Sequence, residues 1–254
     1  MNRAAAGYTA RMLLLLPLLA AAQDELSYSG NLGDNAANYK PGAPVSITHS
    51  GGNLQVRCME VTALNARVAY TVYGTSEGNM KSFGDGVGLA VWGDSKGGGA
   101  KTRIPSKGSG VSSAEVTLTV SIPKGTTSVT VSQSGSGWAQ VIGCSGFVKV
   151  TGGGGGVYLG GPLTGFSASA TGGDVKIEVE ESTLTSTSTA SSPGALTVVL
   201  PSAQGGKLSA KGAEVSVQQV VMGTNEPTYV AGEMGIGGPS ITLSAKGRVE
   251  LSSP

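Results

Sequence analysis

The sequence is poor in charged and aromatic residues and has almost no histidine. Only 13% of its 254 residues are charged and 5% are aromatic, and His49 is the single histidine. So little charge excludes the class of disordered acidic or basic chains, and the residue bias typical of helical proteins is also missing. One histidine leaves few ways to build an enzyme that needs an imidazole as general base. These absences favour a folded, non-catalytic protein for which no cofactor is expected.

The charge balance argues against nucleic acid and anionic lipid as partners. The chain has 17 basic and 16 acidic residues, and the two arginines at its start, Arg3 and Arg11, precede a predicted cleavage point. Without them, 15 basic residues face 16 acidic ones. A chain so close to neutral has no electrostatic attraction for a polyanion.

The N-terminus has the pattern of a secretory signal peptide. The two arginines are followed by an apolar run over 12–19 and three alanines ending at Ala22. This run is too short for a membrane span of about 20 residues, so we expect cleavage between Ala22 and Gln23. Later stretches are not apolar enough to span a membrane. The mature protein is therefore predicted to be exported, to the periplasm, the cell surface or the extracellular space.

The division of the chain follows from this cleavage point. Residues 1–22 are the predicted signal peptide, 23–40 a flexible N-terminal segment, and 41–254 a single domain of β-strand repeats. One large β domain commonly reaches this size without dividing.

Two cysteines, Cys58 and Cys144, lie in the exported part. An oxidising compartment allows them to form one intramolecular disulfide. Two separate buried thiols are the alternative, because a pair of cysteines is weak evidence for pairing. A disulfide would require their Cα atoms to lie within about 7 Å of each other.

From Val45 onward the sequence is a series of short runs rich in Val, Ile, Thr, Ser and Tyr, separated by glycine-containing turns. Such runs predict strands, and the alternation in Val116–Ile122 predicts one half-buried face. The expected strands are Val45–His49, Leu54–Val61, Arg67–Tyr73, Val87–Trp92, Ala114–Ile122, Ser128–Ser132, Ala139–Ile142, Phe147–Val150, Val157–Leu159, Phe166–Ala170, Val175–Val179, Leu184–Thr189, Ala195–Leu200, Lys207–Ala210, Val215–Val221 and Ile241–Leu251.

Glycine-rich corners recur between these strands at a spacing of about ten residues in the middle of the chain, most visibly in Gly152–Gly156. Glycine suits a sharp corner because positive φ is cheap only without a Cβ. The sequence Leu-Ser-Ala-Lys-Gly also occurs twice, ending at Gly212 and Gly247. Strand and tight corner in alternation predict an all-β, β-solenoid-like stack, with a β-sandwich as the alternative.

The layout resembles a family of exported bacterial proteins, the putative-adhesin family, whose domain of β-strand repeats has no assigned function. The resemblance extends from about Tyr39 to Ser252. It lies in an opening strand, turn and strand over Pro41–Val56, a strand ending in a proline turn over Val116–Gly125, the segment Gly165–Ile177, and a closing portion from Gly194 to Pro201 and Gly212. The long loop Met222–Pro239 and the five-glycine run depart from this layout. The resemblance implies a β-solenoid or a related stack with an envelope or surface role, and it brings no catalytic residues.

Two serine motifs were weighed as catalytic. Ser76 stands in a G-x-S-x-G pattern, but no histidine follows it, and the surrounding sequence predicts strand, turn and strand without the helix that a nucleophile elbow needs. Ser95 stands in Gly-Asp-Ser-Lys-Gly-Gly, where Lys96 interrupts the protease-like pattern and His49 is too near in sequence for a double barrel. Both motifs are interpreted as turns, and no catalytic residue is predicted.

Binding residues are harder to identify. The glycine runs complete no phosphate-binding motif, and two cysteines with one histidine make no zinc site, so no metal is predicted. Backbone-held calcium stays open as an alternative. Trp92, Trp138 and Tyr158 are the candidate binding aromatics, against the alternative that they pack in strands.

The sequence thus predicts a non-catalytic structural or adhesion-type envelope protein. A carbohydrate- or ligand-binding module is the alternative, and it predicts that Trp92, Trp138 or Tyr158 cluster on one exposed face. The expected partner is an unidentified envelope or surface component, with self-association through an uncapped strand edge as a further option. The loop Met222–Pro239 is the candidate cap or binding loop.

Overall fold

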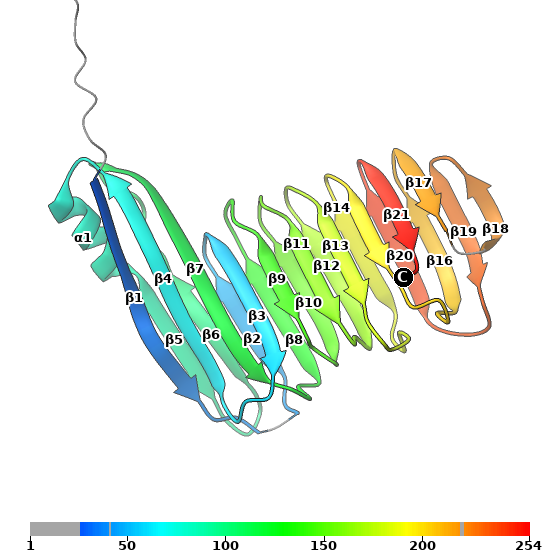
Figure 1. Cartoon of the computed structure of the whole chain (residues 1–254), viewed down its shortest axis with the longest axis horizontal. Helices are drawn as coiled ribbons and strands as arrows, with labels where there is room; N and C mark the ends of the chain where they lie inside the picture. Colours follow the sequence, from blue (N-terminus) through cyan, green and yellow to red (C-terminus); the bar gives the residue numbers. More distant parts are fainter. Residues whose placement is uncertain (1–25, 41, 219–220) are drawn as a thin grey trace, which may run out of the picture.

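The computed structural model describes residues 26–40, 42–218 and 221–254, and in these residues the protein is almost entirely β (Figure 1). The predicted signal peptide 1–22 and its cleavage point between Ala22 and Gln23 lie outside the described residues. The described strands form two large mixed sheets, which we call sheet A and sheet B.

Sheet A has ten strands. Their spatial order is β1 (Leu26–Ala37), β4 (Leu64–Gly74), β7 (Val111–Pro123), β3 (Asn53–Met59), β9 (Ala139–Ile142), β11 (Val157–Gly161), β13 (Val175–Val179), β15 (Leu196–Val199), β21 (Arg248–Ser252) and β17 (Glu214–Val217). Sheet B has eleven strands. Their order is β5 (Gly88–Gly93), β6 (Gly98–Arg103), β2 (Val45–His49), β8 (Ser128–Gln133), β10 (Phe147–Gly152), β12 (Gly165–Ala170), β14 (Ser188–Ser192), β20 (Ser240–Ala245), β16 (Gly206–Lys211), β19 (Tyr229–Met234) and β18 (Val221–Glu226).

The chain alternates between the two sheets through the middle of the molecule. From β8 to β15 each strand of sheet B is followed by one of sheet A, and each strand from β8 to β13 pairs in parallel with the strand two places further along the chain. We call one sheet B strand and the sheet A strand that follows it a layer. Because every layer pairs with the next through both of its strands, the backbone groups of these short strands are satisfied by their neighbours.

The apolar core lies between the two sheets. In β8 the burial alternates, so that Val129 and Val131 face inward while Thr130 and Ser132 are exposed. The same alternation recurs in the neighbouring strands, and Val148, Phe166 and Ile177 are all fully buried. Each layer thus adds a few apolar side chains to one continuous interior, in keeping with the period-two pattern.

Glycine corners let the layers approach each other closely. The five-glycine run packs against the preceding corner, where Gly154 N–H donates to the Gly135 carbonyl at 2.6 Å. A Cβ on Gly153 would lie 2.1 Å from the Gly135 oxygen, and Gly156 has φ +100°. Neither position accepts another residue without moving the corner, which is why this run consists of glycine.

The last layer departs from sequence order. Strands β20 and β21 pair with β14 and β15 on one side and with β16 and β17 on the other. The chain therefore builds the β16 and β17 layer further out, and later returns to fill the place in between (Figure 1). The two Leu-Ser-Ala-Lys-Gly segments end in these neighbouring layers, where Ala213 N–H donates to the Gly247 carbonyl at 2.8 Å.

The segment Met222–Pro239, expected as a cap or binding loop, contains the hairpin of β18 and β19. This hairpin extends sheet B by two antiparallel strands. Its turn also reaches the edge strand β17 of sheet A. The N–H of Gly212, just before β17, donates to the Thr228 carbonyl, and the N–H of Val215, within β17, donates to the Pro227 carbonyl. The hairpin thus covers part of an otherwise open strand edge.

Two expectations about the N-terminal part are wrong. The segment 23–40, expected to be flexible, contains β1, which pairs with β4 along most of its length. The residues after Ser76, expected to be a turn between strands, form helix α1 (Glu77–Gly86). Ser76 is its N-cap, and Met80 and Phe83 bury the inner side of the helix against the end of the stack. Tertiary packing stabilises a short segment whose own helix propensity is low because it contains two interior glycines.

Candidate functional site

The outer face of sheet B carries a regular array of hydroxyl groups. Along the strands from β2 to β16, most residues that point away from the core are Ser or Thr; the exceptions include Phe147 and Lys149 on β10 and Lys207 and Lys211 on β16. The parallel register aligns them in two rows. The first row is Ser46, Thr130, Lys149, Ser167, Thr189, Thr242 and Ser209; the second is Thr48, Ser132, Thr151, Ser169, Ser191, Ser244 and Lys211.

We call the Ser and Thr residues of these two rows the hydroxyl ladder. Neighbouring strands lie about 4.8 Å apart, so the ladder offers a hydroxyl at that interval along each row, except at Lys149 in the first row and Lys211 at the end of the second. Each hydroxyl can donate one hydrogen bond and accept two. The side chains are short, and the strands that carry them are held on both sides, so little conformational entropy is lost when they bind.

Trp92 lies at one end of the first row. It is on β5 opposite Gly99 of β6, and Gly99 in turn pairs with Ser46. A Cβ on Gly99 would lie 2.3 Å from Trp92 Cζ2, so the indole ring lies across the glycine backbone. The side chain is still 43% exposed. Glycine at position 99 is therefore what lets the ring lie along the outer face of sheet B.

A hollow of about 380 Å³ opens beside the indole ring. We call it the Trp92 hollow; its lining includes Pro44, Ser46, Trp92, Lys96, Gly98 and Thr130. Its wall is the turn between β5 and β6, where Asp94 Oδ1 accepts the N–H groups of Lys96 at 2.7 Å and Gly97 at 3.1 Å. This turn contains the protease-like motif, so Asp94 and Ser95 belong to a hairpin turn, as the sequence predicts. The hollow combines an aromatic wall with hydroxyl groups of the ladder.

A second aromatic ring shares this face. Phe147 of β10 is partly exposed, and a Cβ on Gly165 would lie 2.9 Å from its ring. The ring therefore lies over a glycine of the next strand, as Trp92 does. Sequence reasoning led to the expectation of an outer surface rich in Ser and Thr, but it missed Phe147 and the alignment of the hydroxyl groups in rows. The recurring pattern of Ser or Thr, one small or apolar residue, and Ser or Thr could have indicated the ladder.

Tyr158 lies on the other side of the molecule, on the outer face of sheet A. Its hydroxyl donates to the Glu178 carboxylate, whose other oxygen is 2.8 Å from Lys176 Nζ. The hydrogen bond to Glu178, with burial, raises the pKa of Tyr158 to about 12. Lys176 and Tyr158 together lower the pKa of Glu178. The Tyr158 hydroxyl is thus already hydrogen-bonded within a network with Glu178 and Lys176. The Lys176 ammonium also lies 5.8 Å from the centroid of the Tyr158 ring.

Trp138 lies at neither of these places. It is at the glycine corner just before β9, where its carbonyl accepts the N–H of Leu54, and its side chain is 36% exposed. The structure therefore does not bring Trp92, Trp138 and Tyr158 together on one face. Of the three, Trp92 alone borders both a hollow and the hydroxyl ladder.

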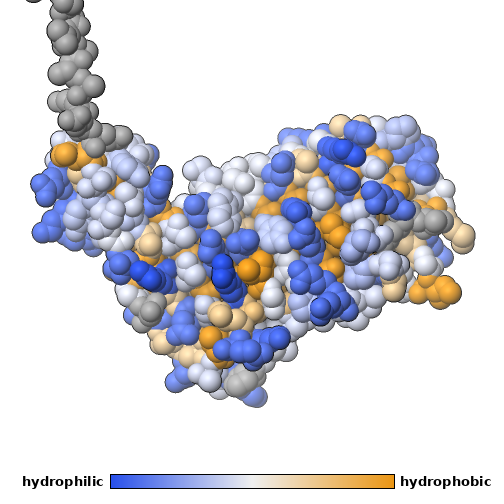
Figure 2. Space-filling model, viewed as in Figure 1, coloured by the Kyte–Doolittle hydropathy of each residue, from blue (hydrophilic) through white to orange (hydrophobic). Residues whose placement is uncertain are grey.

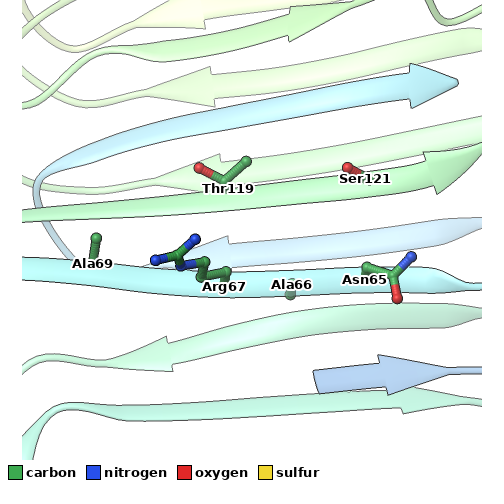
Figure 3. A pocket seen from close by; sticks show the side chains of 6 residues that line it. All are labelled: Asn65, Ala66, Arg67, Ala69, Thr119 and Ser121. Carbon is green, nitrogen blue, oxygen red and sulfur yellow. The ribbon is translucent and has the colours of Figure 1, made fainter. Parts of the chain in front are cut away.

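The outer face of sheet A has shallow hollows of its own, and Figure 2 shows that polar and apolar residues are interspersed over the side of the molecule seen there. One hollow of about 310 Å³ lies over β4 and β7, where Asn65 and Arg67 of β4 neighbour Thr119 and Ser121 of β7 (Figure 3). A second, of about 430 Å³, is lined in part by Arg57 and Tyr158. The first hollow has Arg67 as its one charged lining residue, the second has both Arg57 and Glu180, and neither lining includes a tryptophan.

His49 is buried between the sheets and is not placed for catalysis. Its Nδ1 is 2.8 Å from Thr102 Oγ1, a hydroxyl that also accepts the N–H of Ser50. Its Nε2 is buried without a well-formed hydrogen bond among the described residues. Burial lowers the pKa of His49 to about 4, an effect that the nearby Val116 carbonyl only partly offsets. The ring is therefore neutral at pH 7.

The lowered pKa of His49 predicts a loss of stability in mild acid. The unfolded chain takes up the proton near pH 6.5, whereas the folded protein takes it up only near pH 4. Stability from this group is complete above about pH 6.5 and falls as the pH drops to about 4, by about 3 kcal/mol in total. Urea unfolding at pH 7.5, 6, 5 and 4 measures this loss.

The matched variant is His49→Asn, which keeps a polar group beside Thr102 and does not titrate in this range. Its free energy of unfolding should depend less on pH between 6.5 and 4 than that of the wild type. Equal pH dependence in the two proteins would contradict a neutral, buried His49.

Ser76 also has a structural role in this arrangement. Its Oγ accepts the N–H of Asn79 at 3.4 Å, which satisfies one of the free donors at the start of α1. The strand, turn and helix around it do match the layout of a nucleophile elbow, contrary to expectation, but its hydroxyl caps the helix, and His49 is bound to Thr102.

Within 26–40, 42–218 and 221–254, no three His, Cys, Asp or Glu side chains gather in a way that could hold a metal ion. In the same residues, no helix has the length and hydrophobicity to cross a membrane.

No protein-family model and no curated protein matches the chain. Among similar solved structures, one is a putative cell adhesion protein from Clostridium sporogenes, 15% identical with a TM-score of 0.42, covering 91% of this chain and 100% of that chain. Another is a putative adhesin from Bacteroides fragilis, 10% identical with a TM-score of 0.29, covering 90% and 97%. A third is a putative lipid binding protein from Parabacteroides distasonis, 11% identical with a TM-score of 0.31, covering 90% and 96%.

Two of these three names agree with the family resemblance given in the sequence analysis. At identities of 9–15% and TM-scores of 0.29–0.42, the similar structures assign no ligand, partner or activity to this chain. The function has to be argued from the surfaces described above.

Proposed function

We propose that this chain is an exported, non-catalytic adhesion-type protein of the cell envelope, and that the outer face of sheet B is its binding face. The hydroxyl ladder is the observation that carries the proposal. It repeats from β2 to β16 in an unbroken register, although Ser and Thr on an exposed strand need no such order for solubility. A rigid, repeated set of donors and acceptors suits a partner that is itself extended or repeated.

The architecture we propose for this role is a flattened β-solenoid, made of residues 26–254 as a single domain. Alternation of strands between the sheets and parallel pairing of successive layers support it. A stack of this kind produces long flat faces from a short repeated unit. The signal peptide predicted for 1–22 and the disulfide between Cys58 and Cys144 support export, because disulfides persist in oxidising compartments.

The second candidate function is a carbohydrate- or ligand-binding module. The specific observation that favours it is the Trp92 hollow, where an exposed indole borders hydroxyl groups of the ladder. The two functions are compatible, because a surface adhesin acts by binding a ligand.

The proposal predicts that the full chain is exported when it is produced in a bacterial host with a C-terminal tag. N-terminal sequencing of the exported protein should begin at Gln23, and beads coated with the mature protein should adhere to bacterial or host cell surfaces. Cell fractionation followed by bead counting under flow measures both results. A protein that stays in the cytoplasm with Met1 intact, or coated beads that adhere no better than albumin-coated ones, would contradict the proposal.

A further inference from the structure

We propose that the outer face of sheet B binds one chain of an uncharged polysaccharide, which lies across the strands along the hydroxyl ladder and stacks a sugar ring on Trp92. This inference rests on the proposed function, because it takes the same face as the binding face. It adds the chemical class of the ligand, the direction in which it lies and the residue that anchors it.

Trp92 provides the anchor. Its ring lies across Gly99 and is 43% exposed, so one of its faces is open to solvent. No hydrogen bond joins the indole N–H to another of the described residues. An amphipathic ring of this kind presents an apolar surface to the C–H face of a pyranose and a donor to its hydroxyls. The Trp92 hollow, at about 380 Å³, has room for a sugar ring beside the indole.

The hydroxyl ladder provides the track. The first row leads from Ser46, beside the Trp92 hollow, through Thr130 to Ser209. Its seven strands span about 29 Å at the usual strand separation. Sugar rings joined in a chain present hydroxyls at a repeat of similar size, so successive units meet equivalent groups. Phe147 lies three strands from Gly99 on the same face and offers a second ring for stacking, about 14 Å away.

Charge selects a neutral polymer. The cations of the two rows and of the adjoining strand β6 are few and far apart. Among the described residues, Lys101 of β6 pairs with Thr48, Lys149 lies three strands further along, and Lys211 ends the second row. At the Trp92 hollow, Lys96 is balanced by the neighbouring Asp94. An acidic polymer would meet too few cations to offset its loss of hydration, whereas uncharged hydroxyls can exchange hydrogen bonds with the ladder at little cost.

The area of the hydroxyl ladder argues against a second copy of the chain as its occupant. Its two rows over seven strands cover roughly 400 Å², about half of the ~800 Å² per partner of a stable protein interface. A polymer can compensate for a small contact area at one site by engaging many copies of the protein along its length.

Affinity electrophoresis tests the inference, with the mature protein run through gels that contain hydroxyethyl cellulose, xylan, laminarin or dextran as neutral polymers. Polygalacturonate and heparin serve as acidic ones. We expect retardation by at least one neutral polymer and none by the acidic ones. Trp92→Ala should weaken that binding at least about tenfold, and Thr130→Val with Thr189→Val by a smaller factor.

Matched variants separate binding from folding. Trp138→Ala removes an exposed tryptophan at the glycine corner, and Thr197→Val removes a partly exposed threonine hydroxyl from sheet A; both should bind like the wild type. Trp92→Phe should retain most of the binding, because a ring remains. Circular dichroism and thermal unfolding confirm that each variant is folded before its binding is compared.

Several outcomes would overturn the inference. They are the absence of retardation by every neutral polymer, stronger retardation by polygalacturonate or heparin, or equal losses in Trp92→Ala and Trp138→Ala. A wild-type dimer that Trp92→Ala dissociates would identify a second copy as the occupant. If the protein is exported and adheres to cells but ignores the neutral polymers, the inference fails while the proposed function stands. If the protein binds the neutral polymers but is not exported, the proposed envelope function fails while the inference about the ligand stands.

Discussion

Replacing Cys58 and Cys144 together by alanine is expected to lower the free energy of unfolding by about 4 kcal/mol. The two residues form a disulfide in the structure, with Cα atoms 4.9 Å apart and a sequence separation of 86, which decides between the two alternatives left open by the sequence. A crosslink across so long a loop removes much of the conformational entropy of the unfolded chain. Urea unfolding of the oxidised wild type and the double variant at pH 7.5 measures the difference.

The position of this disulfide adds to its effect. Cys58 is near the end of β3, and Cys144 is fully buried at the corner after β9, so the bond joins two adjacent strands of sheet A where the chain leaves them. Wild-type protein kept in dithiothreitol is the matched control and should unfold at about the same urea concentration as the variant. A difference below about 1 kcal/mol between oxidised and reduced protein would show that the crosslink does little to stabilise the fold.

Replacing Phe166 by alanine is expected to cost about 3–5 kcal/mol of unfolding free energy. Phe166 is among the largest side chains with no exposed surface, and it lies in β12 at the centre of sheet B. Removing the ring leaves a cavity that the surrounding strands cannot close, because each is held on both sides by its neighbours. The measurement is again urea unfolding, with the midpoint and the slope fitted separately.

The neighbouring residue supplies the control. Ser167→Ala changes the same strand on its outer side and should alter stability by less than about 0.5 kcal/mol. Phe166→Leu should lie between the two. If Phe166→Ala and Ser167→Ala were equally stable, the side-chain orientation of β12 described here would be wrong, and with it the assignment of the hydroxyl ladder to the outer face.

Much of the strand pattern could be predicted because burial in this fold follows the sequence alternation directly. Val45–His49, Ala139–Ile142 and Val175–Val179 were predicted with the bounds that the structure gives them. In each, apolar residues alternate with polar ones and a glycine-containing turn lies close by. The local sequence is sufficient to predict these strands, because the alternation of residues indicates which face is buried and the nearby glycine indicates where the strand ends.

Other elements depend on partners that the local sequence does not reveal. Strand β6, with the sequence Gly-Gly-Ala-Lys-Thr-Arg, has little β propensity and exists because β5 and β2 pair with it on either side. The run Ile241–Leu251, expected as one strand, is divided between β20 and β21 by a corner at Lys246 and Gly247. The earlier copy of Leu-Ser-Ala-Lys-Gly ends before a corner in the same way, so the repeat could have indicated this break.

The candidate site was only partly predictable for a related reason. The turn after Trp92 followed from local sequence, whereas the sequence left open whether Trp92 is exposed or packed. The hydroxyl ladder depends on the register between strands as far apart as Ser46 and Thr130. Register between distant strands is set by the whole stack and not by either strand alone. The ladder therefore emerges only when the layers are aligned.

The placement of β20 and β21 has a consequence for how the protein is made. On a ribosome these strands are synthesised after β16–β19, yet their place is between that outer layer and the layer of β14 and β15. The layer of β16 and β17 cannot reach its final position until β20 and β21 have paired on both sides. The stack therefore cannot assemble strictly from one end to the other. A nonsense mutation just before Ser240 would therefore do more than remove one layer. It would separate β16–β19 from the rest of the stack and expose unpaired strand edges on β14, β15, β16 and β17.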